Sequence, residues 1–480
     1  MSTHSLYEAV REAGRPDDPA FLADHETHTY DELLRAAAEF AASLAAGPDP
    51  GEPLVCELSD RWGTAVVTLG CDLAEVPLVH RDPRSPGSIP GRLVHDGQAR
   101  RPGHEETACL GGRLWLRHSR DGTPPPAGLP ARSQTFLTSG STGAPVGVVR
   151  TARAVLADAL RVGGFLAYAS DAPVVTSAPL FHAYGFNYGL LAPLLAGAAV
   201  RSCAAHVVPS QLVRAVRELG ARTLIALPAH YGLLARSLEQ GRDDLAAGLA
   251  GLRSGVSAGA PLAPGVAGSV ARRCTFAFYN CYGSSEAGAV TLTRVTGTED
   301  TGFIGEPLPG VEARVVPLDA TSTAGELQLR TTSLAAGRLG AGGVEPLAAA
   351  DGWYPTGDLA ETVGPEGALR LVGRMSTVIN IAGKKVTPEE IERVLTTHPD
   401  IVDVQVLAAP DEARGQVPVA RIVLRNDITS DALVGWCRQR LAPYQIPRSF
   451  EPVKEIPRSA TGKRLAQVDP AGLVTAEEQA

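Results

Sequence analysis

The chain has 480 residues, 44% of them hydrophobic and 20% charged, and its length predicts two to four domains or subdomains. This composition is typical of a soluble globular protein and excludes an intrinsically disordered one. The balance of 44 basic and 52 acidic residues gives a net charge of −8, which argues against nucleic acid or an anionic membrane as the main partner.

The cysteines and the N-terminus predict a cytoplasmic location. The seven cysteines include no CxxC pair and no Cys/His cluster with zinc spacing, so we expect reduced thiols and no structural zinc. The N-terminal segment MSTHSLYEAVREAGRPDD is charged and lacks the apolar stretch of a signal peptide. The longest apolar run, LLAPLLAGAAV at 190–200, is too short to span a bilayer and is interrupted by Pro193.

The first predicted element is a helix after a capping box formed by Thr29 and Glu32. Its apolar residues recur at helical spacing: Leu33, Leu34, Ala37, Phe40, Ala41 and Leu44. Residues 83–132 are rich in Pro, Gly and Arg, which predicts loops with short strands.

The middle of the chain predicts an α/β architecture. Between about 135 and 310, the apolar strand candidates VVTSAPL, RTLIALP, GLRSGVS and TFAFYNCYG alternate with helical stretches rich in Ala and Leu. This alternation predicts a largely parallel sheet covered by helices. Residues 311–375 change to strand-like segments separated by glycine-rich turns.

A compact α+β domain of about 100 residues is predicted after residue 375. It would begin with a helix at a second capping box, Thr387-Pro388-Glu389-Glu390, which has proline at the first helical position. Strands are predicted at 402–408 and 419–424, and a helix at 430–441. We therefore divide the chain into a large domain, 1–375, and a small domain, 376–480.

The stretch LTSGSTGAPVGVV at 137–149 predicts an anion-binding loop. Its glycines allow successive backbone N–H groups to converge, and its hydroxyl groups add donors for phosphoryl oxygens. It lacks the GxxxxGK[ST] spacing of a Walker A loop, and it contains neither lysine nor arginine. An ordinary flexible Gly/Ser loop is the alternative.

A second candidate site is NCYGSSE at 280–286, directly after an apolar strand. Ligands of α/β proteins bind at the carboxyl ends of such strands. Glu286 could take a magnesium ion there, and Tyr282 could stack on a base. A plain strand end followed by a turn is the alternative.

Two later turns carry weaker signals. Asp358, after Gly357, could accept the hydroxyl groups of a ribose, although an aspartate in a turn most often caps its own backbone. Lys463, in PRSATGK, would on its own be read as a solvated surface lysine.

In combination and in this order, the motifs resemble the adenylate-forming superfamily of acyl-CoA synthetases, aryl-acid and amino-acid adenylation enzymes, and luciferases. Further matching segments are PLFHAYG, LRSGVSAGAPL, GFIGEPLPG, GELQLR, WYPTGDL, LVGR and AGKKVTPEEIE. The resemblance extends from about residue 25 to residue 467. It implies an α/β fold with a large N-terminal domain of α/β subdomains and a small β-barrel-like region, followed by a small mobile α+β C-terminal domain.

The resemblance implies an acid–thiol ligase that acts in two half-reactions. ATP and a small carboxylic acid would give acyl-AMP and pyrophosphate, and the acyl group would then pass to the thiol of coenzyme A or of a carrier protein's phosphopantetheine. The implied cofactors are ATP, Mg²⁺ and coenzyme A or phosphopantetheine, and an acyl or aryl carrier protein is a candidate partner.

By motif position, the resemblance implies roles for individual residues. The phosphates would be held by the loop residues Thr138, Ser139, Gly140, Ser141, Thr142 and Gly143. The rest of the nucleotide would be bound by Ser257, Ala258, Gly259, Asn280, Tyr282, Gly283, Ser285, Asp358 and Arg374. Glu286 would hold Mg²⁺, and Lys463 would bridge carboxylate and phosphate oxygens from the small domain.

The same resemblance implies an acyl pocket formed by His182, Phe186, Asn187, Ser257, Cys281 and Ala287, and a thiol channel at Gly383. His182 would act either as a substrate ligand or as a gate beside the channel. Amino-acid-activating relatives carry an aspartate in the first pocket segment, whereas FHAYGFN has none, so an acid without an α-amino group is implied.

Departures from the family pattern leave two alternatives open. Val146 stands where most relatives have lysine, with Arg150 as a candidate substitute, and Ser376 stands at the hinge position. The first alternative is therefore a catalytically silent adenylate-binding homologue. The second is an α/β-hydrolase, because GVSAG at 255–259 matches GxSxG and Ser257, Asp358 and His398 follow in triad order.

Overall fold

The structure is a computed structural model. It describes residues 5–22, 26–46, 52–59, 61–85, 92–96, 106–117, 126–139, 145–204, 206–297, 302–318, 324–340, 342–349, 351–364, 366–381 and 384–457. The chain divides into two compact units. The first comprises Met1–Thr298, Leu308–Val311 and Thr331–Ala348, and the second Glu299–Pro307, Glu312–Arg330 and Ala349–Ala480.

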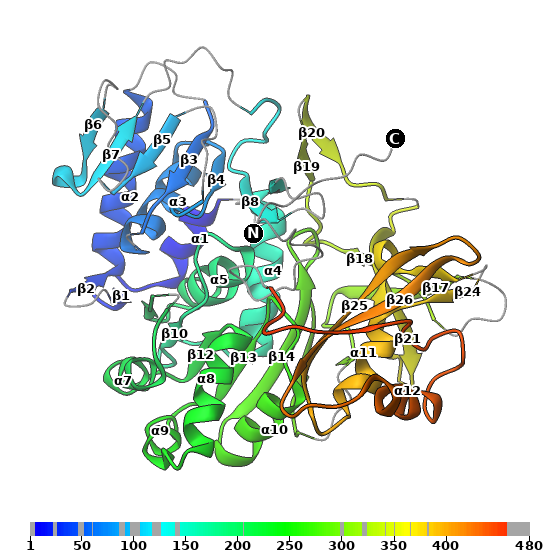
Figure 1. The fold of residues 1–480 in the computed structure, drawn as a ribbon. Helices are drawn as coiled ribbons and strands as arrows, with labels where there is room; N and C mark the ends of the chain where they lie inside the picture. The colour runs from blue at the N-terminus through cyan, green and yellow to red at the C-terminus, as the bar shows by residue number, and fades with distance from the viewer. Residues whose placement is uncertain are drawn as a thin grey trace. The chain divides into compact units, whose positions relative to one another are not determined.

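The central sheet of the first unit is largely parallel, as predicted (Figure 1). Its strands run in the order β15 (Gly288–Arg294), β14 (Ala277–Ser284), β13 (Ser254–Ser257), β12 (Thr223–Ala226), β10 (Val174–Thr176), β11 (Val200–Ser202), β1 (Pro19–Leu22) and β2 (Thr27–Thr29). All neighbouring pairs from β1 to β14 are parallel, and only β2 and β15 pair antiparallel at the two edges.

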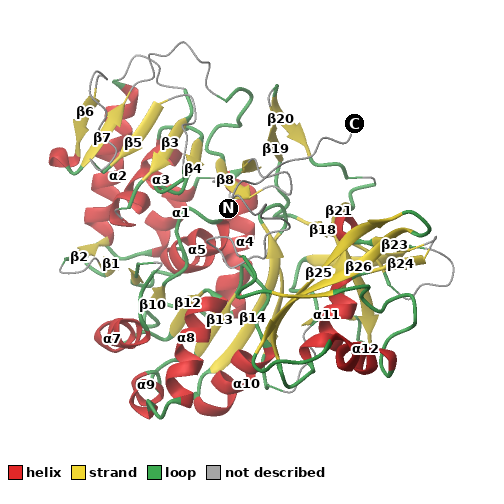
Figure 2. Ribbon diagram, in the orientation of Figure 1, coloured by secondary structure: helices red, strands yellow, loops and turns green. Residues whose placement is uncertain are grey.

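Helices alternate with these strands along the chain (Figure 2). They are α4 (Ala152–Phe165), α5 (Ala183–Phe186), the π-helix η2 (Asn187–Leu191), α6 (Ala192–Leu194), α7 (Pro209–Leu219), α8 (Pro228–Glu239), α9 (Asp243–Gly248) and α10 (Pro264–Arg273). Helix α7 shows why such segments fold this way, since proline starts it and Gly220, at φ 65°, ends it. Its face of Leu212, Val213 and Val216 packs into the core shared with β12.

A second sheet of the same unit contains the predicted phosphate-loop hairpin. Its order is β20 (Gly343–Pro346), β19 (Gly337–Gly340), β9 (Pro145–Arg150), β8 (Gln134–Ser139), β4 (Leu78–His80), β3 (Leu54–Glu57), β5 (Arg92–His95), β7 (Leu114–Arg117) and β6 (Glu106–Cys109). The accompanying helices are α1 (Leu6–Ala13), α2 (Tyr30–Ala45), α3 (Arg61–Leu73) and the 3-10 turn η1 (Leu110–Gly112).

Helix α2 confirms the first capping box. Thr29 Oγ1 accepts from the Glu32 N–H, and the Glu32 carboxylate accepts from the Thr29 N–H. Gly70 lets α3 approach α2 closely, because a Cβ there would lie 2.8 Å from the Ala37 carbonyl oxygen.

The second unit contains a five-stranded sheet where the family resemblance implied a β-barrel-like region. The strands run in the order β16 (Phe303–Gly305), β22 (Ala368–Arg374), β21 (Tyr354–Val363), β18 (Gly325–Thr331) and β17 (Val311–Pro317). Strands β16 and β17 form its two edges, so no closed barrel is formed among the described residues.

The remaining described part of this unit is the α+β region that the sequence predicts. Its strands are β24 (Lys384–Val386), β23 (Ile379–Ile381), β26 (Gly415–Leu424), β25 (Ile401–Asp411) and β27 (Phe450–Pro452). Its helical segments are the 3-10 turn η3 (Met375–Thr377), α11 (Pro388–Thr396) and α12 (Ser430–Arg438). The domain division after residue 375 stays a prediction.

The second capping box is wrong, although the helix that it announced is present. Thr387 is the N-cap of α11 but makes no side-chain capping bond. The Glu390 N–H instead donates to the Thr387 backbone carbonyl, and packing of Ile391 and Leu395 in the core holds the helix in place. Among the described helices, none combines the length and the hydrophobicity that crossing a membrane requires.

Candidate active site

The predicted phosphate loop connects two paired strands. Thr138 on β8 lies opposite Val146 on β9, and the Thr138 hydroxyl donates to the Val146 carbonyl at 3.1 Å. Ser139 pairs with Pro145 at the end of the hairpin. The other predicted loop residues, Gly140, Ser141, Thr142 and Gly143, lie outside the described residues.

The predicted adenine-binding segments lie at neighbouring strand ends. Strands β13 and β14 are parallel, with Ser257 in register with Asn280. Ala258 and Gly259 follow Ser257, and Gly259 adopts a φ of 91°, which turns the chain away from the sheet. The Ser257 hydroxyl is fully buried and has no hydrogen-bond partner among the described residues. The fold therefore brings the two segments together at the edge where α/β proteins bind ligands.

Glu286 occupies the turn of the β14–β15 hairpin. Gly283 permits this tight turn, because a Cβ there would lie 2.3 Å from the Gly288 carbonyl oxygen. The Ala287 N–H donates to the Ser284 hydroxyl at 3.1 Å, which closes the turn from within. The Glu286 carbonyl accepts from the Ala335 N–H at 2.7 Å, which fixes the turn to the segment before β19.

The Glu286 carboxylate pairs with Arg338 of β19. The Arg338 Nη2 and Nε atoms lie 2.8 and 3.1 Å from the same oxygen, Oε1. Among the described residues, no group of three or more His, Cys, Asp or Glu side chains could hold a metal ion by itself. Mg²⁺ needs only one or two protein carboxylates besides phosphate oxygens and water, so Glu286 fits such a site once it releases Arg338.

A buried polar network, which the sequence did not predict, supports this hairpin. At its centre is Asp158 of α4, which is fully buried. Its carboxylate accepts hydrogen bonds from Asn187 Nδ2 at 2.6 Å, from Arg150 Nη1 and the Ala289 N–H at 3.0 Å, and from the Tyr188 hydroxyl at 3.1 Å. Ala289 belongs to β15, three residues after Glu286, so the network orients the hairpin directly.

Gly288 is required where this network meets the hairpin. Its φ is 77°, and a Cβ there would lie 2.4 Å from the Asp158 carboxyl carbon. Ser333 extends the network, because its hydroxyl donates to the Ala287 carbonyl at 2.7 Å. Burial and the negative charge of Asp158 raise the pKa of Tyr188 well above its usual value, so this hydroxyl remains a donor.

Arg150 cannot replace the missing phosphate-loop lysine. Its side chain is fully buried, donates to Asp158, and also donates to the Ser333 carbonyl at 3.0 Å. The sequence interpretation was wrong here because spacing from the loop does not show toward which face of β9 the side chain points.

The predicted acyl-pocket residues have different surroundings. Phe186 is fully buried, with its ring centroid 4.9 Å from His80 and 5.2 Å from Phe136. Asn187 is held by Asp158, whereas His182 remains partly exposed at the start of α5 with its ring 4.7 Å from Phe181. Of these three side chains, His182 is the best placed to meet a ligand.

Cys281 and Ala287 are both buried. Burial, reinforced by Asp158, raises the pKa of the Cys281 thiol, so it remains a neutral apolar group. Tyr184, which the sequence interpretation missed, donates to the Val256 carbonyl at 2.8 Å and to the Ala226 carbonyl at 3.1 Å. It therefore ties α5 to the ends of β12 and β13.

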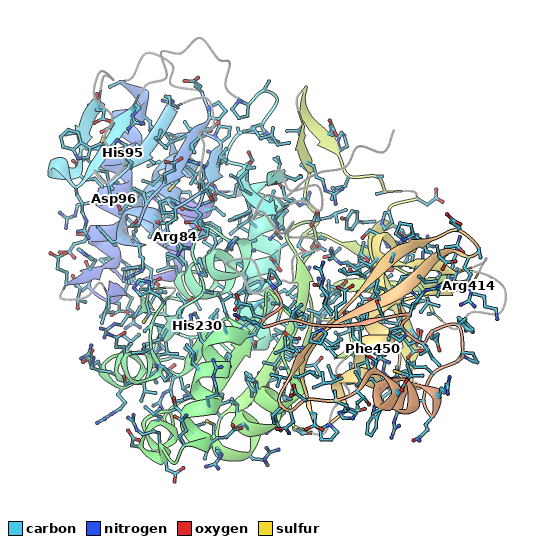
Figure 3. The ribbon with its side chains drawn as sticks, in the orientation of Figure 1. Arg84, His95, Asp96, His230, Arg414 and Phe450 are labelled. Carbon is cyan, nitrogen blue, oxygen red and sulfur yellow. The ribbon has the colours of Figure 1, made fainter. Side chains whose placement is uncertain are left out.

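Another buried contact joins the end of β10 to α8. His230, labelled in Figure 3, has its Nδ1 atom 2.9 Å from the Ser177 hydroxyl. The same nitrogen accepts from the Leu227 N–H at 3.3 Å. Both side chains are buried, so the pair fixes the helix start to the sheet.

In the second unit, the structure pairs Asp358 with Arg374. The two residues lie opposite each other on β21 and β22, with Arg374 Nε 2.7 Å from the Asp358 carboxylate. Asp358 follows Gly357, whose φ is 73°, but both residues lie inside β21, so the turn that the sequence predicted here is not formed. Gly383 and Lys463 lie outside the described residues.

The hydrolase alternative conflicts with this geometry. A GxSxG nucleophile sits in a sharp turn directly between a strand and a helix. Ser257 is instead the last residue of β13 and fully buried, and α10 begins only at Pro264. Asp358 pairs with Arg374, while the His398 Nδ1 atom accepts from the Asp400 N–H at 3.2 Å.

Comparison with known proteins gives matches over nearly the whole chain. Residues 118–338 match the family model of the AMP-binding enzymes, and residues 390–463 match that of the AMP-binding enzyme C-terminal domain. A feruloyl-CoA synthase of Amycolatopsis sp is 30% identical over 91% of this chain and 92% of its own length. A sulfoacetate–CoA ligase of Cupriavidus necator is 28% identical over 95% of each chain.

A solved structure shows the same fold. The O-succinylbenzoate coenzyme A synthetase of Bacillus subtilis, in complex with AMP, superposes with a TM-score of 0.75 at 21% identity. The match covers 96% of this chain and 97% of the other.

Proposed function

Because the chain belongs to the AMP-binding enzyme family, within the adenylate-forming superfamily, we propose that it activates a small carboxylic acid with ATP. The carboxylate attacks the α-phosphorus, which gives acyl-AMP and pyrophosphate. The thiol of coenzyme A then displaces AMP and forms a thioester. The similar feruloyl-CoA synthase and sulfoacetate–CoA ligase support coenzyme A as the acceptor, and a carrier-protein phosphopantetheine is the second candidate.

The observation that carries this proposal is the position of Glu286. The hairpin holds its carboxylate beside β19, which pairs with β9 of the phosphate-loop hairpin. Mg²⁺ bound there would neutralise phosphate charge. Charge stabilisation and positioning provide most of the catalysis in phosphoryl transfer, so the chain's task is to fix the phosphates and the acid.

The remaining roles follow from motif position. In the proposal, Thr138, Ser139, Gly140, Ser141, Thr142 and Gly143 bind phosphates, and Ser285 contacts the α-phosphate. The adenosine is bound by Ser257, Ala258, Gly259, Asn280, Tyr282, Gly283, Asp358 and Arg374. Lys463, in the proposed small domain after residue 375, is the catalytic cation, and Gly383 lines the thiol channel.

The proposed substrate is an aryl or acyl acid without an α-amino group. The pocket segment FHAYGFN contains no carboxylate to pair an ammonium, and the buried Asp158 behind it already holds Arg150 and Asn187. We place the reaction in the cytoplasm, where cysteines without CxxC or zinc spacing, such as the seven of this chain, stay reduced.

Acid-dependent exchange between ATP and labelled pyrophosphate tests the first half-reaction. A panel of aryl, short-chain and long-chain acids should include substrates that give exchange, and added coenzyme A should then yield the thioester. Lys463→Ala should abolish exchange, whereas Lys454→Ala, at an exposed lysine nearby in sequence, should retain it. ATP binding without exchange for any acid would instead support the catalytically silent alternative.

A further inference from the structure

The phosphate-loop hairpin has no cation of its own to offer a phosphate. Arg150 is the only basic residue in residues 134–150, and its guanidinium is held in the buried network with Asp158. Val146 stands where most relatives in the family pattern have a lysine. A cation for this site must therefore come from a neighbouring element.

Strand β19 provides such a cation. It pairs antiparallel with β9, so that Arg338 lies opposite Val148 and Leu339 opposite Gly147. Residues opposite each other share a sheet face, and the two-residue period of a strand places Val146 on that face as well. Thr138 lies opposite Val146, so Thr138, Val146 and Arg338 share one face of the sheet.

The distance across this face suits an arginine. Diagonal neighbours on adjacent strands have Cβ atoms roughly 7–8 Å apart, within reach of a long side chain. The guanidinium of Arg338 can thus occupy the space that a lysine at position 146 would reach. Its present contact with Glu286 shows that it already points toward the side chain proposed to hold Mg²⁺.

The contact between Arg338 and Glu286 can be exchanged for a phosphate. The Arg338 side chain is 49% exposed, and such partly solvated ion pairs contribute little stability. Two of its N–H groups donate to one Glu286 carboxylate oxygen, and a guanidinium matches phosphate geometry with two parallel N–H donors. Phosphate binding would free the Glu286 carboxylate for the metal ion.

We propose that Arg338 binds the β- and γ-phosphates of ATP and replaces the cation that the phosphate loop lacks at Val146. This role rests on the proposed function, since it needs a triphosphate as ligand. This role of Arg338 differs from simple neutralisation of the Glu286 charge. It requires a contact between Arg338 and the β- or γ-phosphate, which ATP and pyrophosphate can make and AMP cannot.

Calorimetric titration with MgATP and with AMP tests the proposal on the whole chain. Arg338→Ala should weaken MgATP binding about 10- to 100-fold, the range expected for a lost charged hydrogen bond, and leave AMP binding unchanged. Arg330→Ala is the matched control, because Arg330 is similarly exposed at 50% and also pairs with a glutamate, Glu312. It should bind both nucleotides like the wild type.

A rescue variant separates charge from structure. Adding Val146→Lys to Arg338→Ala should restore most of the lost MgATP affinity, because the lysine reaches the same space from β9. Equal MgATP affinity of wild type and Arg338→Ala would overturn the role of Arg338, and so would an equal loss for AMP and MgATP. A wild type that binds neither nucleotide would refute the proposed function itself.

Discussion

Asp158→Asn should destabilise the first unit by about 3–5 kcal/mol, the usual cost of breaking a buried ion pair from one side. The structure supports the upper half of this range, because Asp158 and Arg150 are both fully buried. Asparagine keeps the shape of the side chain but offers only one acceptor oxygen. Its amide NH₂ group would also face another donor, namely an N–H of Asn187, Arg150 or Ala289. The positive charge of Arg150 would then be buried without a negative partner.

Equilibrium urea unfolding of Asp158→Asn, Arg150→Met and the double variant measures this coupling. The double variant should lose clearly less free energy of unfolding than the two single variants lose in sum, because the second change removes the charge that the first left unpaired. Asp31→Asn is the control, since the exposed Asp31–Arg35 pair of α2 should contribute less than about 1 kcal/mol. A loss below about 1 kcal/mol for Asp158→Asn would refute the reasoning.

Further predictions concern other parts of the first unit. Gly288→Ala should cost about 2–4 kcal/mol in urea unfolding, because it combines a left-handed φ with a clash against a carboxylate; a neutral effect would contradict the close approach. Burial lowers the pKa of His80 to about 4. The stabilisation that the neutral His80 provides is therefore complete above pH 6.5, and about 3 kcal/mol of the free energy of unfolding is lost as the pH falls toward 4. The stability of His80→Phe should therefore fall less than that of the wild type between pH 7 and 4.5, and parallel curves would contradict this. Cys203 is the one cysteine that is not buried, so maleimide should label it first, and Cys203→Ser should remove the fast phase. An unchanged fast phase would place the reactive thiol elsewhere.

The sequence predicted those features of the fold that depend on neighbouring residues. The capping box at Thr29 and Glu32 is formed by side chains three residues apart, so its pattern is visible in the chain. The apolar strand candidates between 174 and 283 likewise predicted a parallel sheet, and with it the adjacency of the segments at Ser257 and Asn280. The failure of the second capping box shows the limit, because a suitable local pattern does not oblige Thr387 to make the bond.

The support of the site could not be predicted, because it is formed by residues far apart in sequence. Asp158 meets the Ala289 N–H across 131 positions, and Arg338 meets Glu286 across 52. No periodicity links such pairs, and each residue alone is an ordinary charged side chain. Arg150 shows the same limit, since its distance from the loop in sequence suggested a phosphate ligand while its strand face directs it into the core.

The position of β1 has a consequence for how the chain folds during synthesis. Phe21 of β1 is almost completely buried and pairs in register with Val200 of β11. At roughly 5–20 residues per second, the ribosome needs about 10–35 s to extend the nascent chain from β1 to β11. During that interval the strand can pair only with β2, and its other edge is open to association with other chains. This early strand therefore gains its second neighbour only after residue 200 of 480 has been made, and chaperone protection of the nascent chain should matter for it during that interval.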